Sequence, residues 1–273
     1  MNVTWAAAWG QKAARFRRGW GPAVVLALLL LAFWEVGVAV SSVPEWLLPA
    51  PSRIVEAGWE AAGLLREHVG RTLLETVVGL AVSIVTGMTL AVLIDLSPAL
   101  RRALYPLLVV SQTIPIMALA PLLVVWFGFG LLPRVLVVTL VGFFPIAMNT
   151  AQGLESTDPE IMALLASMGA SRLQTLSKVR FPGALPAAFG GIRIAATYSV
   201  IGAVISEWVG ASKGLGIFMI RSANSFLTAR LFAAIALTSI LSVALFGLVL
   251  ATERLLLPWY YAARRQEEWE EMA

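Results

Sequence analysis

The sequence predicts an all-α membrane protein with six transmembrane helices. Of its 273 residues, 59% are hydrophobic and only 13% are charged, and the mean hydropathy is +0.83. A water-soluble domain has about 25% charged residues, so the bilayer is the natural solvent for this chain. Six apolar stretches reach the roughly 20 residues that a membrane helix requires. They are residues 22–40, 73–94, 104–127, 132–151, 187–209 and 231–250.

The distribution of basic residues predicts the orientation of these helices. With the amino terminus inside, the inner segments carry twelve lysines and arginines and the outer segments carry seven. Because the inner loops of membrane proteins are enriched in positive charge, we expect both termini in the cytoplasm. The net charge of +4 follows from these loops, and no compact basic patch with interleaved aromatic residues indicates a nucleic-acid partner.

The two ends of the chain are expected to lie at the inner membrane surface. Residues 1–20 place tryptophans among lysines and arginines, which is typical of an interfacial helix, and a frayed basic tail is the alternative. Residues 257–273 include an acidic run and are expected to form a cytoplasmic tail. Between them, residues 21–256 form the predicted transmembrane domain, with membrane lipid as a partner.

The residue composition excludes several kinds of chemistry. The chain has no cysteine and one histidine, which excludes disulfides, thiol chemistry and the usual zinc sites. That histidine, His68, stands beside Glu67 in an outer loop, where we expect solvated surface. No G-x-x-x-x-G-K-[ST] motif is present, so the usual phosphate loop for ATP is missing. We predict no catalytic residue, no metal site and no cofactor bound by this chain.

Prolines interrupt the third span. Pro106, Pro115 and Pro121 each remove a backbone donor and disturb the helix about one turn earlier. Freed carbonyl groups are tolerated in a bilayer only where protein or a wet cavity satisfies them. Gln112, Thr113 and Pro115 are therefore candidate pore-lining residues, and a kinked packing helix is the alternative.

Small and polar residues mark three other spans. Gly79, Ser83 and Gly87 place small side chains on one face of the second span, where another helix can approach closely. Asn149 ends the fourth span near the cytoplasmic mouth, and Glu207 lies near the outer end of the fifth. Both are candidate pore-lining residues. For Glu207 a solvated interface position is the alternative, because an ionisable group inside the bilayer is costly.

Residues 155–186 form a charged, proline-punctuated loop between the fourth and fifth spans. Asp158, Pro159 and Glu160 predict a helix start, with Asp158 as the cap and Glu160 at the positive end of the helix dipole. An apolar stripe with helical spacing follows: Ile161, Leu164, Leu165 and Met168. A short cytoplasmic helix must bury such a stripe, either in a groove on a partner protein or against the chain's own membrane helices.

The rest of this loop is predicted to be a turn and a second helix. Gly169 is expected to stop the first helix in a left-handed conformation. Ser171 and Gln174 then form a capping box for the second helix. Pro182 is expected to end that helix, and Pro186 to direct the chain back into the membrane.

The loop also carries a recognisable pattern: a short helix, the turn Gly169-Ala170-Ser171, and a second helix followed by Leu185-Pro186. This pattern resembles the signature loop of binding-protein-dependent ABC importer permeases. The resemblance covers roughly residues 47–258 and includes Leu-Pro-Ala-Pro-Ser at 48–52 and Phe-Phe-Pro at 143–145. One departure is that the family's Glu-Ala-Ala is here Ala-Leu-Leu at 163–165, so its acidic contact is absent or supplied by Glu160.

The resemblance implies a type I ABC importer transmembrane domain in the plasma (inner) membrane, together with a set of partners. These are a second copy of the chain with one pore between the copies, two ABC ATPase subunits that hold ATP and Mg²⁺, and an extracytoplasmic substrate-binding protein. It also implies that the ATPase docks on the coupling loop, residues 155–186. The docking residues are expected to be Asp158, Glu160, Leu164, Leu165, Met168, Gly169, Ala170, Ser171, Pro182 and Pro186.

Within the family, residues 111–115 and 206–210 are most similar to permeases for thiamine-pyrimidine precursors or riboflavin. Importers of aliphatic sulfonate, taurine or nitrate are the alternative. A different class, the ion-coupled secondary carriers, needs paired ionisable groups near the middle of the bilayer, whereas here such groups cluster near the ends of the spans. We therefore expect the permease subunit of an ATP-driven importer, with ATP hydrolysed by another subunit.

Overall fold

The computed structural model describes residues 5–41 and 43–263, with side chains from residue 21 onward. Every regular element in these ranges is helical, and the all-α prediction is confirmed. The chain divides into two compact units, one of Met1–Ala62 with Ser222–Ala233 and the other of Gly63–Arg221 with Ala234–Ala273. The side chains of the predicted interfacial segment 1–20, and residues 264–273 of the predicted tail, lie outside the described part.

The first unit contains α1 (Trp5–Ser41), α2 (Pro51–Glu60) and the first residues of α11 (Thr228–Leu256). The carboxylate of Glu35 in α1 fastens the start of α2. It accepts hydrogen bonds from the backbone N–H of Ser52 at 3.0 Å and from its hydroxyl at 2.7 Å. This interaction satisfies one of the N–H groups that the first turn of a helix leaves without a partner.

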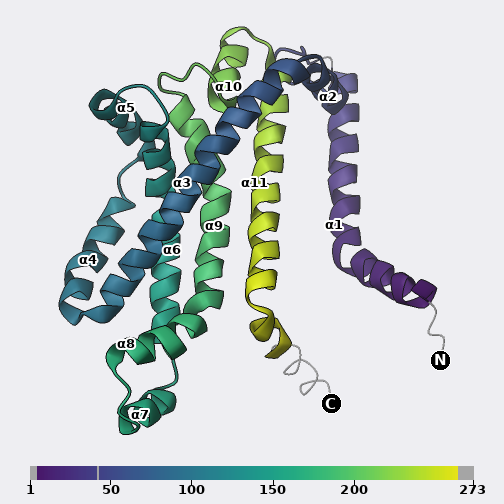
Figure 1. The fold of residues 1–273 in the computed structure, drawn as a ribbon. Helices are drawn as coiled ribbons and strands as arrows, with labels where there is room; N and C mark the ends of the chain where they lie inside the picture. The colour runs from purple at the N-terminus through teal and green to yellow at the C-terminus, as the bar shows by residue number, and fades with distance from the viewer. Residues whose placement is uncertain (1–4, 42, 264–273) are drawn as a thin grey trace. The chain divides into compact units, whose positions relative to one another are not determined.

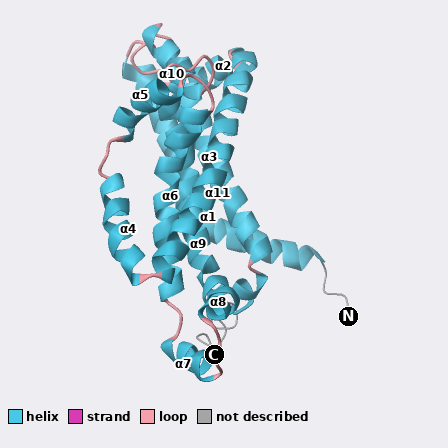
Figure 2. Ribbon diagram, turned by 60° about the vertical axis from the view of Figure 1, so that its left-hand side comes forward, coloured by secondary structure: helices cyan, strands magenta, loops and turns pink. Residues whose placement is uncertain are grey.

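The second unit contains the remaining helices (Figure 1). In chain order they are α3 (Ala62–Leu96), α4 (Pro98–Ser111), α5 (Ile116–Phe127), α6 (Leu132–Glu155), α7 (Pro159–Ser167), α8 (Arg172–Thr175), the π-helical turn η1 (Leu176–Arg180), α9 (Phe181–Glu207), α10 (Leu215–Asn224) as far as Arg221, and the rest of α11. Figure 2 shows α7 and α8 at one end of this unit and α5 and α10 at the opposite end. We refer to these as the α7 end and the α10 end.

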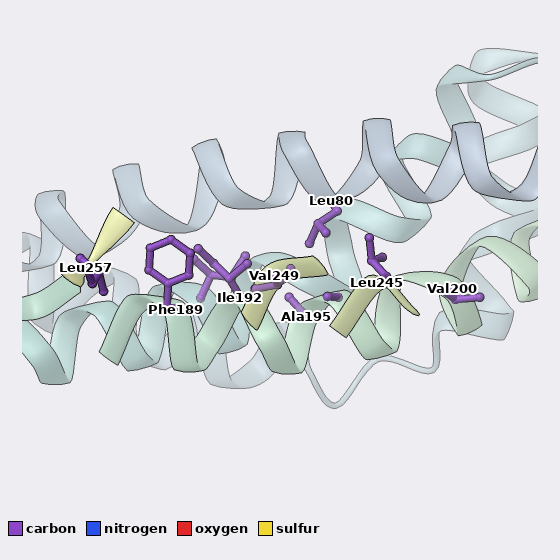
Figure 3. Close-up of a cluster of buried hydrophobic side chains, with 10 residues drawn as sticks. Leu80, Phe189, Ile192, Ala195, Val200, Leu245, Val249 and Leu257 are labelled. Atoms are coloured by element: carbon purple, nitrogen blue, oxygen red, sulfur yellow. The ribbon is translucent and has the colours of Figure 1, made fainter. Parts of the chain in front are cut away.

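The core of the second unit is built around α9. Leu80 of α3, Ile192 of α9, and Leu245 and Val249 of α11 belong to one buried apolar cluster (Figure 3). The small residues on α3 allow α6 to approach closely, as their spacing predicts. A Cβ atom on Gly87 would lie 2.7 Å from the carbonyl oxygen of Phe143, closer than real side chains allow.

Five helices within the described residues are long and apolar enough to cross a membrane, and six if a bent pair counts as one span. The bent pair is α4 and α5, which meet at an angle of 100°. The third predicted span is therefore two helices rather than one kinked helix, with the break at residues 112–115. Pro115 precedes the first residue of α5, whereas Pro106 and Pro121 lie inside their helices.

Candidate functional site

The helix α7 begins as its sequence predicts. The side chain of Asp158 accepts a hydrogen bond from the backbone N–H of Glu160 at 2.8 Å, and Pro159 occupies the first helical position. A proline is suited to that position because its missing N–H would have no partner in any case. Glu160 follows in the first turn, where a negative charge meets the positive end of the helix dipole.

The apolar stripe of α7 is uncovered. No residue of α7 is buried, and Ile161, Leu164 and Met168 are 45%, 59% and 74% exposed. Of the two environments that the sequence allows, packing against the chain's own membrane helices is therefore not the one observed. An exposed apolar helix face at one end of a helical unit is a typical docking surface for another protein.

The turn after α7 has the predicted left-handed glycine. Gly169 has φ +75°, and the N–H of Ala170 returns to the carbonyl of Leu165 at 3.0 Å. The capping box is also confirmed. The N–H of Gln174 donates to the hydroxyl of Ser171 at 3.3 Å, and the N–H of Ser171 donates to the Gln174 side chain at 2.8 Å.

The two prolines that follow do not act as predicted. Pro182 does not end a helix, and Pro186 lies inside α9, because α8, η1 and α9 form one continuous helical segment. In η1 the N–H of Phe181 donates to the carbonyl of Leu176, five residues back. This wider turn changes the hydrogen-bond pattern just before Pro182, which then occupies the first turn of α9, where it is tolerated.

The candidate pore residues lie on different elements. Gln112 and Thr113 are exposed in the break between α4 and α5, beside Pro115. The side-chain amide of Asn149 is half-buried and donates to the carbonyl of Pro145 at 2.8 Å. The break thus exposes Gln112 and Thr113 at a surface of the second unit, and their place in a pore lining stays a prediction.

Glu207 requires a correction. The sequence placed it in a pore lining or at a solvated interface, but its exposure is 0%. Its carboxylate accepts hydrogen bonds from the hydroxyl of Thr72 and from the N–H of Gly216, both at 2.6 Å. A side chain enclosed by its own chain cannot line a pore in this conformation.

His68 is also buried rather than solvated, and it helps Glu207 to cap α10. The N–H of Gly214 donates to Nδ1 of His68 at 2.9 Å, and the N–H of Leu215 donates to the hydroxyl of Thr72 at 2.8 Å. With the Gly216 bond to Glu207, three backbone donors at the start of α10 are satisfied by side chains of α3 and α9. The first N–H groups of a helix have no partner within their own helix, so this cap stabilises α10.

A second buried polar pair lies on α3 and α6. Arg134 is 6% exposed and Glu75 is 0% exposed, and the guanidinium donates to the carboxylate at 2.7 Å. Arg71 also donates to Glu75, at 2.8 Å. At the α7 end, Arg180 is paired with Asp95. Sequence reasoning missed both pairs, and the only available signal was the presence of ionisable residues at the ends of apolar runs.

The described residues form a helical membrane body with an uncovered, capped loop helix, which is typical of a membrane-embedded subunit that docks a partner. Residues 83–257 match the family described as "Binding-protein-dependent transport system inner membrane component". The chain therefore belongs to this family of ABC importer permeases, and it is a multi-pass membrane protein.

Among the similar proteins is the formylaminopyrimidine transport permease protein ThiX of Halalkalibacterium halodurans. It is 40% identical over 233 residues, which cover 85% of this chain and 93% of ThiX. The riboflavin transport system permease protein RibX of Chloroflexus aurantiacus is 36% identical, over 86% of this chain and 88% of RibX. A structure of the MetNI methionine ABC transporter in an inward-facing conformation shares the fold, with a TM-score of 0.57, 23% identity, and coverage of 70% of this chain and 97% of that one.

Proposed function

We propose that this chain is the permease subunit of an ATP-driven importer in which two copies enclose one pore. Two ABC ATPase subunits would dock on the coupling loops, and an extracytoplasmic binding protein would deliver the solute. The observation that carries this proposal is the exposed stripe of α7, held between the Asp158 cap and the Gly169 turn. Membership of the family supports the same set of partners.

The orientation follows from the docking role. ATPase subunits work where ATP is available, so the α7 end faces the cytoplasm and the α10 end faces outward. The excess of lysine and arginine in the inner segments supports the same orientation, with both termini inside.

The energy for transport would come from the ATPase, which holds ATP and Mg²⁺. A partner can shift a two-state equilibrium only if it binds the two states unequally. Closure of the ATPase pair on ATP would bring the two coupling loops together and favour an outward-facing arrangement of the spans. Gln112, Thr113 and Asn149 are the residues that we assign to the lining of the transport path.

The solute that we favour is a thiamine-pyrimidine precursor or riboflavin. The two relatives named for formylaminopyrimidine and riboflavin transport support this choice. Aliphatic sulfonates, taurine and nitrate are the alternative. The test is to purify the binding protein that works with this chain and measure by calorimetry which of these compounds it retains. Retention of taurine or nitrate alone would contradict our choice of solute while leaving the permease role intact.

The docking role is tested by two variants at adjacent positions of α7. Leu164→Glu places a charge in the stripe and should reduce the amount of co-purified ATPase about tenfold, since a charge in an apolar interface is left unpaired. Ala163→Glu places the same charge about 100° around the helix, and it introduces the residue type that the family has there. This control should keep the ATPase bound. Equal binding in both variants would contradict the docking surface.

An ion-coupled carrier remains a function of a different class. It would transport its solute in vesicles without any ATPase, driven by an ion gradient alone. Gradient-driven uptake by the isolated chain would therefore favour the carrier, whereas uptake that requires both the ATPase and ATP supports the importer.

A further inference from the structure

The second half of the coupling loop makes most of the contacts between this loop and the rest of the second unit. The helix α7 has no buried residue, whereas Thr175 of α8 and Leu176 of η1 are each only 8% exposed. A force applied to α7 therefore reaches the membrane helices through the two covalent ends of α7 and through the contacts of the α8–η1 segment. Arg180, the last residue of that segment, makes four hydrogen bonds to other helices.

Arg180 binds two different helices with one side chain. Its Nη1 and Nη2 atoms donate to the two carboxylate oxygens of Asp95 at 2.8 and 2.6 Å. Its Nε and Nη2 atoms donate to the backbone carbonyl of Leu154 at 3.1 and 2.8 Å. We call these three groups the Arg180 clamp. Two-pronged arginine–carboxylate pairs fix geometry as well as charge, which a lysine cannot reproduce.

The clamp joins the ends of the long helices at the α7 end. Asp95 is the next-to-last residue of α3, and Leu154 is the next-to-last residue of α6. The last carbonyls of a helix have no partner within the helix and lie at the negative end of its dipole, so a cation is favoured there. Arg180 thus caps α6 and neutralises Asp95 while it belongs to the segment that continues into α9.

Three further features support the clamp. The side chains of Arg180 and Asp95 are 21% and 8% exposed, so solvent screens this pair less than a surface pair. Leu154, Leu176 and Ala184 form a buried apolar cluster beside it, which holds the same helices together. Arg180 is also the last residue of η1, and π-helical turns occur frequently at functional sites.

We propose that Arg180 is the positioning residue that transmits movement of the coupling loop to α3 and α6. This inference rests on the proposed function. Through the clamp, a displacement of the α7–α8 loop would carry the α7 ends of three membrane helices together. Without it, the loop could move with the ATPase while α3 and α6 stay in place. The ATPase would then still bind and hydrolyse ATP, but the membrane helices would no longer follow.

The test uses the complete complex and a readout at the α10 end. Because the chain has no cysteine, Ser212→Cys in the exposed loop before α10 accepts a single spin label per copy. The distance between the two labels is measured with and without ATP and orthovanadate. In the otherwise unchanged complex this distance should change. In Arg180→Gln the ATPase should remain bound, and the fraction of complexes that switch should fall about tenfold, since charge-assisted hydrogen bonds are removed.

Three variants make the result specific. Asp95→Asn keeps nearly the same side-chain shape and should reduce the fraction of switching complexes as Arg180→Gln does. Arg180→Lys keeps the positive charge, so its fraction should lie between those of Arg180→Gln and the parent complex. Lys178 is an exposed residue of the same η1 turn, and the complex with Lys178→Gln should switch normally. Normal switching in both Arg180→Gln and Asp95→Asn would overturn the proposed role of the clamp. Loss of the ATPase from the Arg180→Gln complex would also overturn it, because Arg180 would then be a docking residue. If the parent complex itself holds no ATPase, the proposed function fails instead.

Discussion

The guanidinium of Arg134 donates a 2.7 Å hydrogen bond to the carboxylate of Glu75, and both side chains are buried between α3 and α6. Removing one partner of a buried ion pair leaves the other charge without compensation, which destabilises a protein by about 3–5 kcal/mol. We expect Glu75→Gln to lower the thermal unfolding temperature of the detergent-purified protein accordingly. Glu45→Gln is the control, because its pair with Arg53 is exposed and should contribute less than about 1 kcal/mol.

The same pair allows a second measurement. Replacing both partners together, in Glu75→Met with Arg134→Met, removes both charges of this buried pair and should recover most of the stability lost in Glu75→Gln. If the double variant were less stable than the single one, the ion pair itself would be a net source of stability, contrary to our expectation.

Thr72 links Glu207 to the start of α10. Its hydroxyl donates to the Glu207 carboxylate and accepts from the N–H of Leu215. Thr72→Val keeps the shape but removes both bonds, and we expect a loss of about 1–3 kcal/mol because buried donors and acceptors are left unpaired. Hydrogen exchange at the amide of Leu215 should accelerate. Thr252 has an exposed hydroxyl that donates to the carbonyl of Leu248 in its own helix, so Thr252→Val should change neither the stability nor the exchange rate at Leu215.

Substitutions at Gly169 test whether coupling between the ATPase and the membrane helices requires a residue in the left-handed conformation. A Cβ atom there would meet no atom within 4 Å, so any effect of substitution comes from the backbone at φ +75°. Gly169→Val should reduce binding-protein-stimulated ATP hydrolysis, since a residue with a Cβ pays about 1–2 kcal/mol in this conformation. Gly169→Asn should have a smaller effect, because asparagine is among the residues with a Cβ that adopt this conformation most readily. If the two variants hydrolysed ATP at the same rate, coupling would not depend on the left-handed conformation of this turn.

The exposed break in the third span can be examined by thiol labelling. The absence of natural cysteine means that a single introduced cysteine reports without background. Thr113→Cys should react with a membrane-impermeant reagent at least about tenfold faster than Glu207→Cys, because reactivity follows exposure. Ala195→Cys, at a fully buried position, sets the unreactive limit. Slow labelling at residue 113 in every nucleotide state would remove it from the transport path.

Local patterns in the sequence were sufficient for the membrane class and for the architecture of the loop. Run length and composition predicted the apolar helices, and the Asp158 cap, the Gly169 turn and the Ser171 capping box form as predicted. Each depends on residues only a few positions apart. The three prolines of the third span indicated a disturbed helix, but they did not locate the break at Pro115 or its 100° angle.

Only the tertiary structure decided which polar residues are enclosed. Thr72 and Glu207 are 135 positions apart, and Asp95 and Arg180 are 85 apart, so no local pattern could pair them. The sequence predicts that ionisable residues such as Glu207 lie at the surface, because an unpaired charge in the bilayer is costly. Folding lowers this cost by placing a polar partner beside the buried group. Pro182 likewise lies in the first turn of α9 rather than at the end of a helix, because the π-helical turn η1 continues the helical segment into α9.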